Sequence, residues 1–319
     1  DKNYARTLIT GSYLYSSNNT DFWVNFFSEK DLRNQSLHQD LSDKDKRILT
    51  FAGDNPELWL VNSIDSVSFS ADYVMYALVD TLGFDSVLVY STEADRAHYR
   101  ASFSYVGVGK GNYVHARSIA NGRVFEWVQP INNIPQGDYE PVIVLTPPRK
   151  HWQLSTGLRQ QICKYLEFGL EISVSENDIN TFSEVDNDNN IGAASKIYLQ
   201  HFNEIKIKGK QYNFRKLISY EFEETNFNSV ERFRSVDFER NWNIQNLVLL
   251  NNKHIFSAFL GLEKKNTKLI DFQSDYIYLP SLMKGTKNNL NLNFANDFFS
   301  IKHNTMLTKS DMSLYATSF

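Results

Sequence analysis

Alternating hydrophobic and polar residues dominate the second half of the chain. Between Leu166 and Ser175 every other residue is apolar, and the positions between them hold Glu, Gly or Ser. A period of two places all the apolar side chains on one side of an extended backbone. The segment is therefore predicted to be a β-strand with one apolar and one polar face.

The same pattern predicts a series of long antiparallel strands. Segments 194–208 and 211–223 flank Gly209 and Lys210, which together are a tight-turn signal. Each arm is much longer than the usual strand of about five or six residues. Further strands are expected at Arg232–Trp242, His254–Leu262, Lys268–Leu279 and Asn289–Ile301. Short polar connectors between them favour an up-and-down meander.

The chain is expected to have three parts. Residues 1–30 are predicted to form an N-terminal β-hairpin that belongs to the main sheet, and residues 149–319 to form the antiparallel meander or barrel strands. Between them, residues 31–148 are predicted to form a globular β-rich insertion lobe of short strands. Pro147 and Pro148 mark its boundary, because proline interrupts a strand.

One helix is expected inside the insertion lobe, at Leu41–Ala52. Ser42 is a suitable N-cap, and acidic residues follow it at the positive end of the helix. Gly53 is suited to end the helix. The fold class is therefore predicted to be all-β. A long-stranded antiparallel meander is expected to form an outer-membrane β-barrel or part of one, with a small globular β-rich insertion that contains one short helix.

Composition agrees with this fold and narrows the function. Aromatic residues make up 14% of the chain, which favours strands. The formal net charge of −4 argues against a basic nucleic-acid-binding surface. The single cysteine, Cys163, excludes a disulfide within the chain and is predicted to be a buried strand thiol. No apolar run reaches the ~18–20 residues of a membrane helix, whereas a barrel strand needs only ~9–11 residues.

The Asx-rich stretch after the Leu166–Ser175 strand contains the one candidate metal site. Asp186, Asp188 and Asn190 present oxygen ligands at alternating positions, as a calcium ion requires. Ile191 occupies the place where a calcium-binding loop of the helix-loop-helix type has glycine, and its bidentate glutamate is absent. A solvated loop remains the alternative, and no other cofactor is expected.

Other candidate sites have simpler explanations. Residues 107–112 resemble a glycine-rich phosphate loop but lack the Lys-Ser/Thr ending and the following helix, so a hairpin turn is favoured. The seven histidines have no zinc-ligand spacing. Glu167 and Glu171 share one strand face, and a pair of carboxylates is what a glycosidase needs, but the polar side of a sheet explains them equally well. The charges of 232–240 favour cross-strand pairing or the lining of a lumen.

Several short sequence segments resemble those of a family of large, uncharacterised, β-rich outer-membrane and cell-envelope proteins of Bacteroidota-type bacteria. They lie at residues 1–6, 109–114, 120–124, 136–142 and 234–242, and the likeness spans nearly the whole chain. The resemblance implies an exported protein associated with the outer membrane, with no enzymatic residues to carry over. Family members are longer, so Asp1 would be a fragment boundary rather than a processing site. Phe319 with Tyr315 resembles the aromatic carboxyl terminus of outer-membrane barrels.

The leading hypothesis is a non-enzymatic outer-membrane or cell-surface protein that acts in scaffolding, transport or assembly. Its expected partners are outer-membrane lipid or other envelope proteins, with polysaccharide as a further candidate and no nucleic acid. The first alternative is a soluble β-sandwich that binds carbohydrate through exposed tryptophans, namely Trp23, Trp59, Trp127 and Trp152. The second is a secreted glycan hydrolase, for which no residue pattern stands out.

Overall fold

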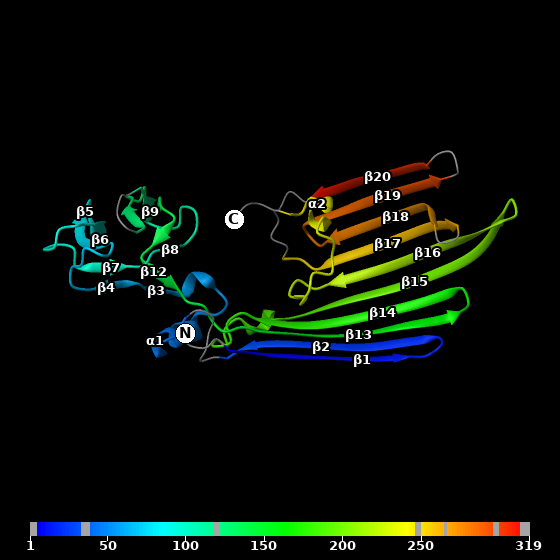
Figure 1. Ribbon diagram of the computed structural model, residues 1–319, viewed down its shortest axis with the longest axis horizontal. Coiled ribbons are helices and arrows are strands. Elements are labelled where there is room, and N and C mark those ends of the chain that lie inside the picture. Colours follow the sequence, from blue (N-terminus) through cyan, green and yellow to red (C-terminus); the bar gives the residue numbers. More distant parts are fainter. Residues whose placement is uncertain are drawn as a thin grey trace. The chain divides into compact units, whose positions relative to one another are not determined.

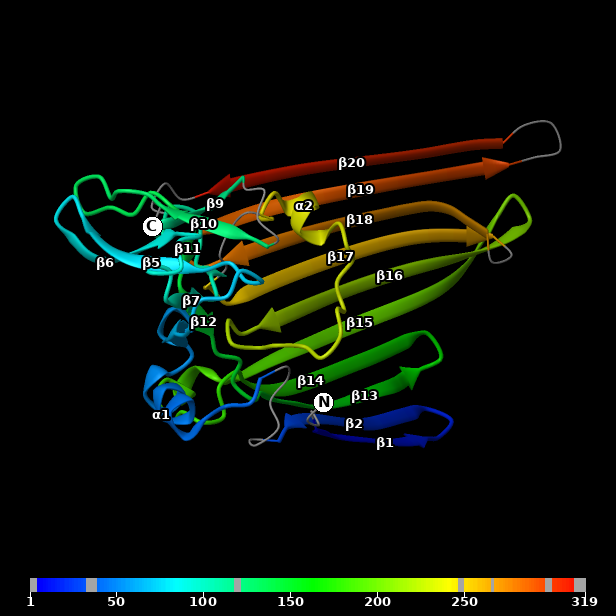
Figure 2. The same cartoon turned by 60° about the vertical axis from the view of Figure 1, so that its left-hand side comes forward.

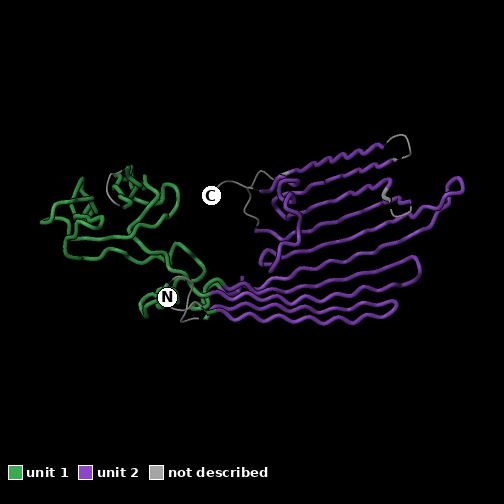
Figure 3. The backbone as a smooth tube through the Cα atoms, viewed as in Figure 1, with its two compact units in different colours: residues 1–5, 32–148, 179–186 green, residues 6–31, 149–178, 187–319 purple. Residues whose placement is uncertain are grey.

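The chain divides into two compact units (Figure 3). The computed structural model describes residues 5–32, 39–117, 122–245, 250–264, 267–295 and 300–312. Unit 1 comprises residues 1–5, 32–148 and 179–186, and unit 2 comprises residues 6–31, 149–178 and 187–319. The terminal residues Tyr315 and Phe319 lie outside the described residues.

Unit 2 is built on one ten-stranded antiparallel sheet (Figure 1). Its strands follow one another in chain order: β1 (Arg6–Ser16), β2 (Thr20–Asp31), β13 (Lys150–Cys163), β14 (Leu166–Asp178), β15 (Ile191–Ile207), β16 (Lys210–Glu223), β17 (Lys253–Lys264), β18 (Thr267–Leu279), β19 (Met283–Ala295) and β20 (Ser300–Met312). The predicted all-β fold with a long-stranded meander is confirmed.

The strand register sorts the side chains of this sheet onto two faces. Directly paired residues of antiparallel strands point to the same side. One row runs through Leu158, Leu170, Ile197 and Tyr220, and its side is called the apolar face. A neighbouring row on the opposite side, the polar face, pairs Glu171 with Lys196 and Lys196 with Glu221.

The apolar face is exposed along the whole width of the sheet. Large apolar side chains on this face that lie open are Ile9, Tyr13, Tyr15, Phe22, Phe26, Leu154, Ile172, Ile191, Ile197, Leu199, Ile218, Phe256, Leu260, Phe272, Tyr276, Tyr278, Phe294, Ile301 and Leu307. Soluble monomers rarely expose a continuous apolar patch larger than a few hundred Å². A patch of this extent is typical of a surface that binds another protein, a ligand or a membrane.

The two edge strands, β1 and β20, differ from the inner strands. Every residue of β1 is exposed. On the polar face, the exposed large apolar side chains of the described strands also belong to the edges: Leu8 and Leu14 on β1, and Met306 on β20. The edges of the sheet thus carry apolar residues on both faces.

Unit 1 contains two four-stranded sheets that share an aromatic core. One sheet has the order β10-β9-β11-β8 and the other β4-β7-β5-β6. The bounds are β4 Ile64–Ser66, β5 Tyr76–Thr81, β6 Phe84–Tyr90, β7 Tyr99–Ala101, β8 Ser104–Tyr105, β9 Tyr113–Ala116, β10 Val124–Trp127 and β11 Tyr139–Glu140. Tyr76, Leu88, Tyr113 and Phe125 are buried between the sheets. A two-stranded sheet pairs β3 (Leu60–Asn62) with β12 (Val142–Val144).

The helix expected in the insertion is present as α1 (Asp43–Ala52). The Ser42 hydroxyl accepts a hydrogen bond from the backbone N–H of Asp45, and the Asp45 carboxylate accepts one from the backbone N–H of Ser42. This capping box satisfies two backbone donors that a helix end leaves free. Leu49 and Ala52 pack beneath the helix against Trp59 and Leu145.

Four local predictions are wrong. Segment 232–242 is not a strand: it contains a loop and the short helix α2 (Phe238–Trp242), because its apolar residues pack at helical spacing onto a sheet face. The predicted strand 289–301 is instead the end of β19 and the start of β20. Cys163 is exposed at the end of β13 rather than buried. The turn residues of the β15–β16 hairpin are Lys208 and Gly209, both with positive φ, one position earlier than expected.

Candidate functional site at the polar face

A single connection folds back over the polar face of unit 2. It joins β16 to β17, and its described part, residues 224–245, is called the strap. Figure 2 shows the strap, in yellow, crossing the sheet from the end of β16 to α2. Through the three sets of contacts below it reaches residues on seven neighbouring strands, β13 to β19. Loops without regular structure that exceed about 12–15 residues are uncommon unless they are functional.

Hydrogen bonds hold the first half of the strap to β13 and β14. The backbone N–H of Asn228 donates to Ser175 Oγ at 2.9 Å, and that of Val230 donates to Gln153 Oε1 at 2.9 Å. His151 Nε2 lies 3.0 Å from the carbonyl oxygen of Asn228. A side chain at Gly192 on β15 would overlap the strap backbone, so glycine is required there.

Apolar packing holds the second half of the strap to β17, β18 and β19. Trp242 and Ile244 are buried against Ile255, Ile277, Leu279 and Met283, which come from the polar face. Gly285 on β19 leaves room for the Trp242 ring, and Lys287 lies over that ring at 5.2 Å from its centroid. This is the one buried apolar cluster in the described part of unit 2.

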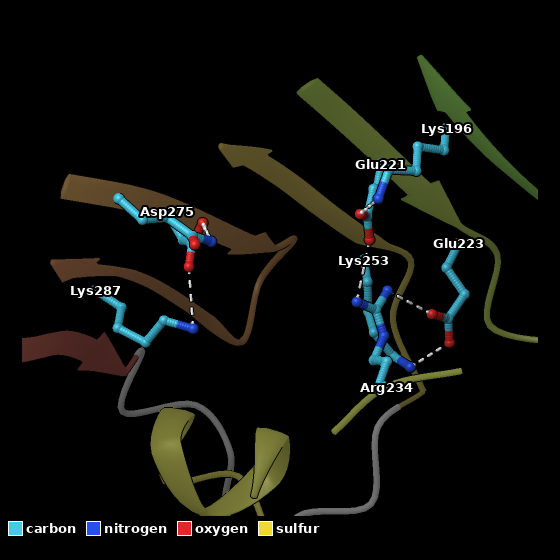
Figure 4. Close-up of polar contacts among 8 residues, drawn as sticks. Lys196, Glu221, Glu223, Arg234, Lys253, Asp275 and Lys287 are labelled. Atoms are coloured by element: carbon cyan, nitrogen blue, oxygen red, sulfur yellow. Dashed lines mark hydrogen bonds and ion pairs between the residues drawn. The ribbon is translucent and has the colours of Figure 1, made fainter. Parts of the chain in front are cut away.

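A chain of ion pairs links the middle of the strap to the sheet (Figure 4). Arg234 Nη2 lies 2.9 Å from Glu223 Oε2, and Arg234 Nη1 lies 3.2 Å from Glu221 Oε2. Glu221 also pairs with Lys196 at 2.6 Å, and Glu223 pairs with Lys253. The planar guanidinium suits Arg234 to bridge two carboxylates, which a lysine ammonium does less well.

These ion pairs are partly shielded from solvent. The Arg234 side chain is 16% exposed and that of Glu223 is 10% exposed. Removal of one partner would leave the other charge poorly solvated, so the pair resists disruption more than a surface pair does. Farther along the sheet, Lys287 and Asp275 form a similar shielded pair at 3.0 Å.

The strap and the sheet line a half-open pocket of about 710 Å³. Its walls combine aromatic, hydroxyl, amide and charged side chains, including Asn25, Phe27, Gln153, Ser173, Phe227 and Phe233. Carboxylates outnumber cationic groups among the lining residues: Glu171, Glu221, Glu223 and Glu231 against Lys196 and Arg234. Glu171 and Glu231 form no ion pair within the described part of the chain.

The calcium candidates do not contribute to this pocket. Asp186 has positive φ and belongs to unit 1, whereas Asp188 lies in the short 3-10 helix Asn187–Asn189 of unit 2. Asn190 is buried, and its Nδ2 donates to Asn187 Oδ1 at 3.0 Å. Among the described residues no group of three or more His, Cys, Asp or Glu could hold a metal ion. Because the candidate set includes an asparagine, calcium binding there stays a prediction.

The glycine-rich segment 107–112 has its backbone donors already in use. The N–H of Gly109 donates to Asp138 Oδ1 and that of Asn112 donates to Glu140 Oε1, where a phosphate loop would keep such groups for its ligand. Burial raises the pKa of the Glu140 carboxyl. The predicted hairpin turn is also wrong, because β8 and β9 both pair with β11 and not with each other.

The tryptophans proposed as a carbohydrate platform are not exposed. Trp59 is buried in the core of unit 1, and Trp127 packs against the aromatic core. Trp23 covers Gly157 on the polar face, and Trp152 Nε1 donates to Glu176. Trp23, Trp127 and Trp152 are partly buried, and carbohydrate binding stays a prediction. In the described part of the chain no helix is long and apolar enough to cross a membrane.

The strap is a feature that the sequence pattern did not reveal. Its charges at 232–240 fall within a segment predicted to be a strand. The signal that could have found it is the contrast between a long polar connection and the apolar pair Trp242 and Ile244 within it. Buried apolar residues inside a long connection indicate that it folds back onto the protein.

Comparison of the chain with protein-family models, curated proteins and solved structures finds no match. The resemblance to Bacteroidota-type envelope proteins therefore stays a prediction.

Proposed function

We propose that unit 2 spans a bacterial outer membrane and that the chain acts there as a non-enzymatic scaffold, transport or assembly component. The observation that carries this proposal is the exposed apolar face across all ten strands. The strands have 11–17 residues, and a tilted strand needs only about 9–11 to cross a bilayer. Membrane lipid would cover this face, while the polar face would enclose a lumen.

The distribution of aromatic residues supports a lipid environment. An aromatic cluster lies on the apolar face, at the end of the sheet where the connection that contains the strap leaves β16 and enters β17. Its members are Tyr220, Phe222, His254, Phe256 and Tyr278. Rings with polar tips are favoured at the boundary between lipid and water. Such a cluster would sit at one membrane interface.

The edges of the sheet have to be paired in a bilayer, because lipid offers no hydrogen-bond partners to a free strand edge. The sheet has ten strands in meander order, so β1 and β20 run antiparallel to each other. We infer that these two edges pair and close the sheet into a barrel. The apolar side chains that the edges carry on the polar face, such as Leu14 and Met306, would then lie beside a neighbouring strand.

The connections indicate an orientation. At one end of the sheet the turns are tight, as at Lys208 and Gly209. At the other end, unit 1, the Asx-rich connection and the strap leave the sheet. Outer-membrane barrels have short periplasmic turns and longer external loops. Unit 1 would therefore lie at the cell surface, where it could contact envelope proteins or polysaccharide.

Detergent dependence tests the membrane assignment. The purified chain should require detergent or lipid vesicles to stay monodisperse. After insertion into vesicles, the unboiled protein should migrate on a gel at a position different from that of the boiled protein. A monodisperse monomer in plain buffer would exclude the proposal.

Cysteine cross-linking tests closure of the barrel. In a Cys163→Ser background, Ser12→Cys on β1 would be combined in turn with Asn304→Cys, Met306→Cys and Thr308→Cys on β20. A disulfide within one molecule is expected for one member of the series. Disulfide-linked dimers would instead indicate that the edges pair between copies.

A further inference from the structure

The two halves of the strap are held in different ways. Trp242 and Ile244, in the second half, are 1% exposed and fixed by apolar packing. The first half, residues 225–236, is held by hydrogen bonds and by Arg234, and its apolar side chains Phe233 and Val236 are 58% and 78% exposed. Segments with few buried apolar contacts open at lower free energy than segments with many.

We propose that the first half of the strap is a movable constriction of the lumen, and that the opened path conducts small cations. This inference rests on the proposed function of unit 2. With the strap seated, its backbone lies across the polar side of β13 to β16 through contacts with Gln153, Ser175, Gly192 and Glu221. Barrels of about eight strands are already filled by side chains, so a strap seated across a lumen of ten strands narrows the water path.

Arg234 holds the first half of the strap against the sheet, and it is called the latch. It forms the ion pairs that join the first half of the strap to the wall, and it joins two wall carboxylates at once. Without it, Glu221 and Glu223 keep their wall partners Lys196 and Lys253. The wall therefore retains its own ion pairs when the strap leaves. Opening abandons the Arg234 contacts, the two backbone hydrogen bonds, the His151 contact and the packing of Phe227 on Gly192.

The wall that opening would reveal favours cations. Three carboxylates of the sheet face the pocket, those of Glu171, Glu221 and Glu223, and the wall lysines Lys196 and Lys253 pair with two of them. Glu171 has no ion-pair partner in the described part of the wall. Rings of carboxylates select cations in membrane pores.

Planar-bilayer recordings of the whole chain in potassium chloride test the latch. Wild-type protein should show small or rare openings, and Arg234→Gln should raise the open fraction or the conductance several-fold. Arg234→Lys, which keeps the charge but not the two-pronged geometry, should lie between them. Arg240→Gln is the matched control, because Arg240 is 69% exposed and pairs only with Asp237 within the strap; it should behave as wild type.

A disulfide lock keeps the test independent of folding defects. In a Cys163→Ser background, Ser175→Cys with Asn228→Cys should tie the strap to β14. Openings should disappear in the oxidised protein, including in the Arg234→Gln background, and return when a reductant is added. Under a potassium chloride gradient, Glu171→Gln should lower the preference for K⁺ over Cl⁻.

The outcomes separate the two proposals. Protein that fails to insert into vesicles refutes the membrane assignment itself. The constriction alone is refuted by a protein that inserts and shows the boiling-dependent gel shift but has one conductance in all three forms. Those forms are the oxidised disulfide variant, the wild type and Arg234→Gln. Anion preference in the unlatched variant overturns the assignment of cations.

Discussion

The aromatic core of unit 1 and the apolar face of unit 2 are made of the same kinds of residue but have opposite surroundings. In unit 1 two small sheets face each other, and rings such as Phe103 and Phe125 stack at 4.5 Å between centroids. In unit 2 a single sheet leaves rings such as Phe256 and Tyr276 open. The comparison teaches that the apolar side of a strand favours burial, but that it does not determine what covers it. Unit 1 supplies its own cover, whereas unit 2 leaves its apolar face exposed, and under the proposed function lipid covers it.

The largest expected effect is in the core of unit 1. Phe125→Ala should reduce the free energy of unfolding of unit 1 by about 3–5 kcal/mol, because it removes a buried ring and leaves a cavity. Urea unfolding of the whole chain in detergent, followed by hydrogen exchange of unit 1 peptides, measures this loss. Leu82→Ala is the control, since Leu82 is an exposed residue of the same unit. Equal effects of the two changes would show that the core assignment is mistaken.

Next in size is a charge on the apolar face. Ile218 is 60% exposed on this face, and Ile218→Arg should cost about 2–4 kcal/mol of stability in lipid vesicles. Val108 of unit 1 is 82% exposed, and Val108→Arg should change stability by less than about 0.5 kcal/mol. Urea titration of vesicle-inserted protein compares the two variants. If Ile218→Arg proved as harmless as Val108→Arg, the apolar face would be in water.

A smaller effect is expected where aromatic rings lie over glycines of the polar face. A side chain at Gly169 would overlap the ring of Tyr198, which lies directly opposite on β15. Gly169→Ala should therefore cost about 1–3 kcal/mol, because the ring has to move. A methyl group at Gly11 on β1 would meet no other atom within 4 Å, so Gly11→Ala should be close to neutral. The same urea titration in vesicles measures both, and a neutral Gly169→Ala would show that the ring moves freely.

The smallest expected effect concerns two buried tyrosines that join the sheets of unit 1. Tyr76 Oη accepts a hydrogen bond from the backbone N–H of Phe125, and Tyr113 Oη accepts one from that of Leu88. Tyr76→Phe and Tyr113→Phe should each cost about 0.5–1.5 kcal/mol, measured by hydrogen exchange of unit 1 peptides. A change of only a few tenths for both would show that water replaces these bonds.

The same tyrosines predict a pH dependence. Burial raises the pKa of both hydroxyls, so the folded state favours their neutral form. Their contribution to stability is complete below a pH of about 10, the pKa in the unfolded chain, and is lost as the pH rises through the folded-state pKa. Unit 1 should therefore weaken above a pH of about 10, and the double Tyr→Phe variant should weaken less. An equal alkaline loss in both proteins would assign it to other groups.

The regular parts of the molecule could be predicted from the sequence, and the irregular parts could not. The ten residues from Leu166 alternate without interruption, and β14 follows them. The capping signals at Ser42, Asp45 and Gly53 correctly indicated α1. Both predictions succeed because their causes are local, namely side-chain alternation and helix capping. Segment 232–242 was wrongly predicted to be a strand because its partners, such as Ile277 and Met283, lie far away in the chain.

By itself the amino-acid sequence determined that this protein is a chain of long ribbons with one apolar and one polar side, together with a lobe of shorter strands. The alternation of side chains acts within each strand and needs no partner to be recognised. Only the tertiary structure decided that the strap lies on the polar face, that Arg234 joins Glu221 to Glu223, and that the described part of unit 2 leaves its apolar face exposed. Those features depend on strand register and on contacts between distant segments, which local pattern does not encode.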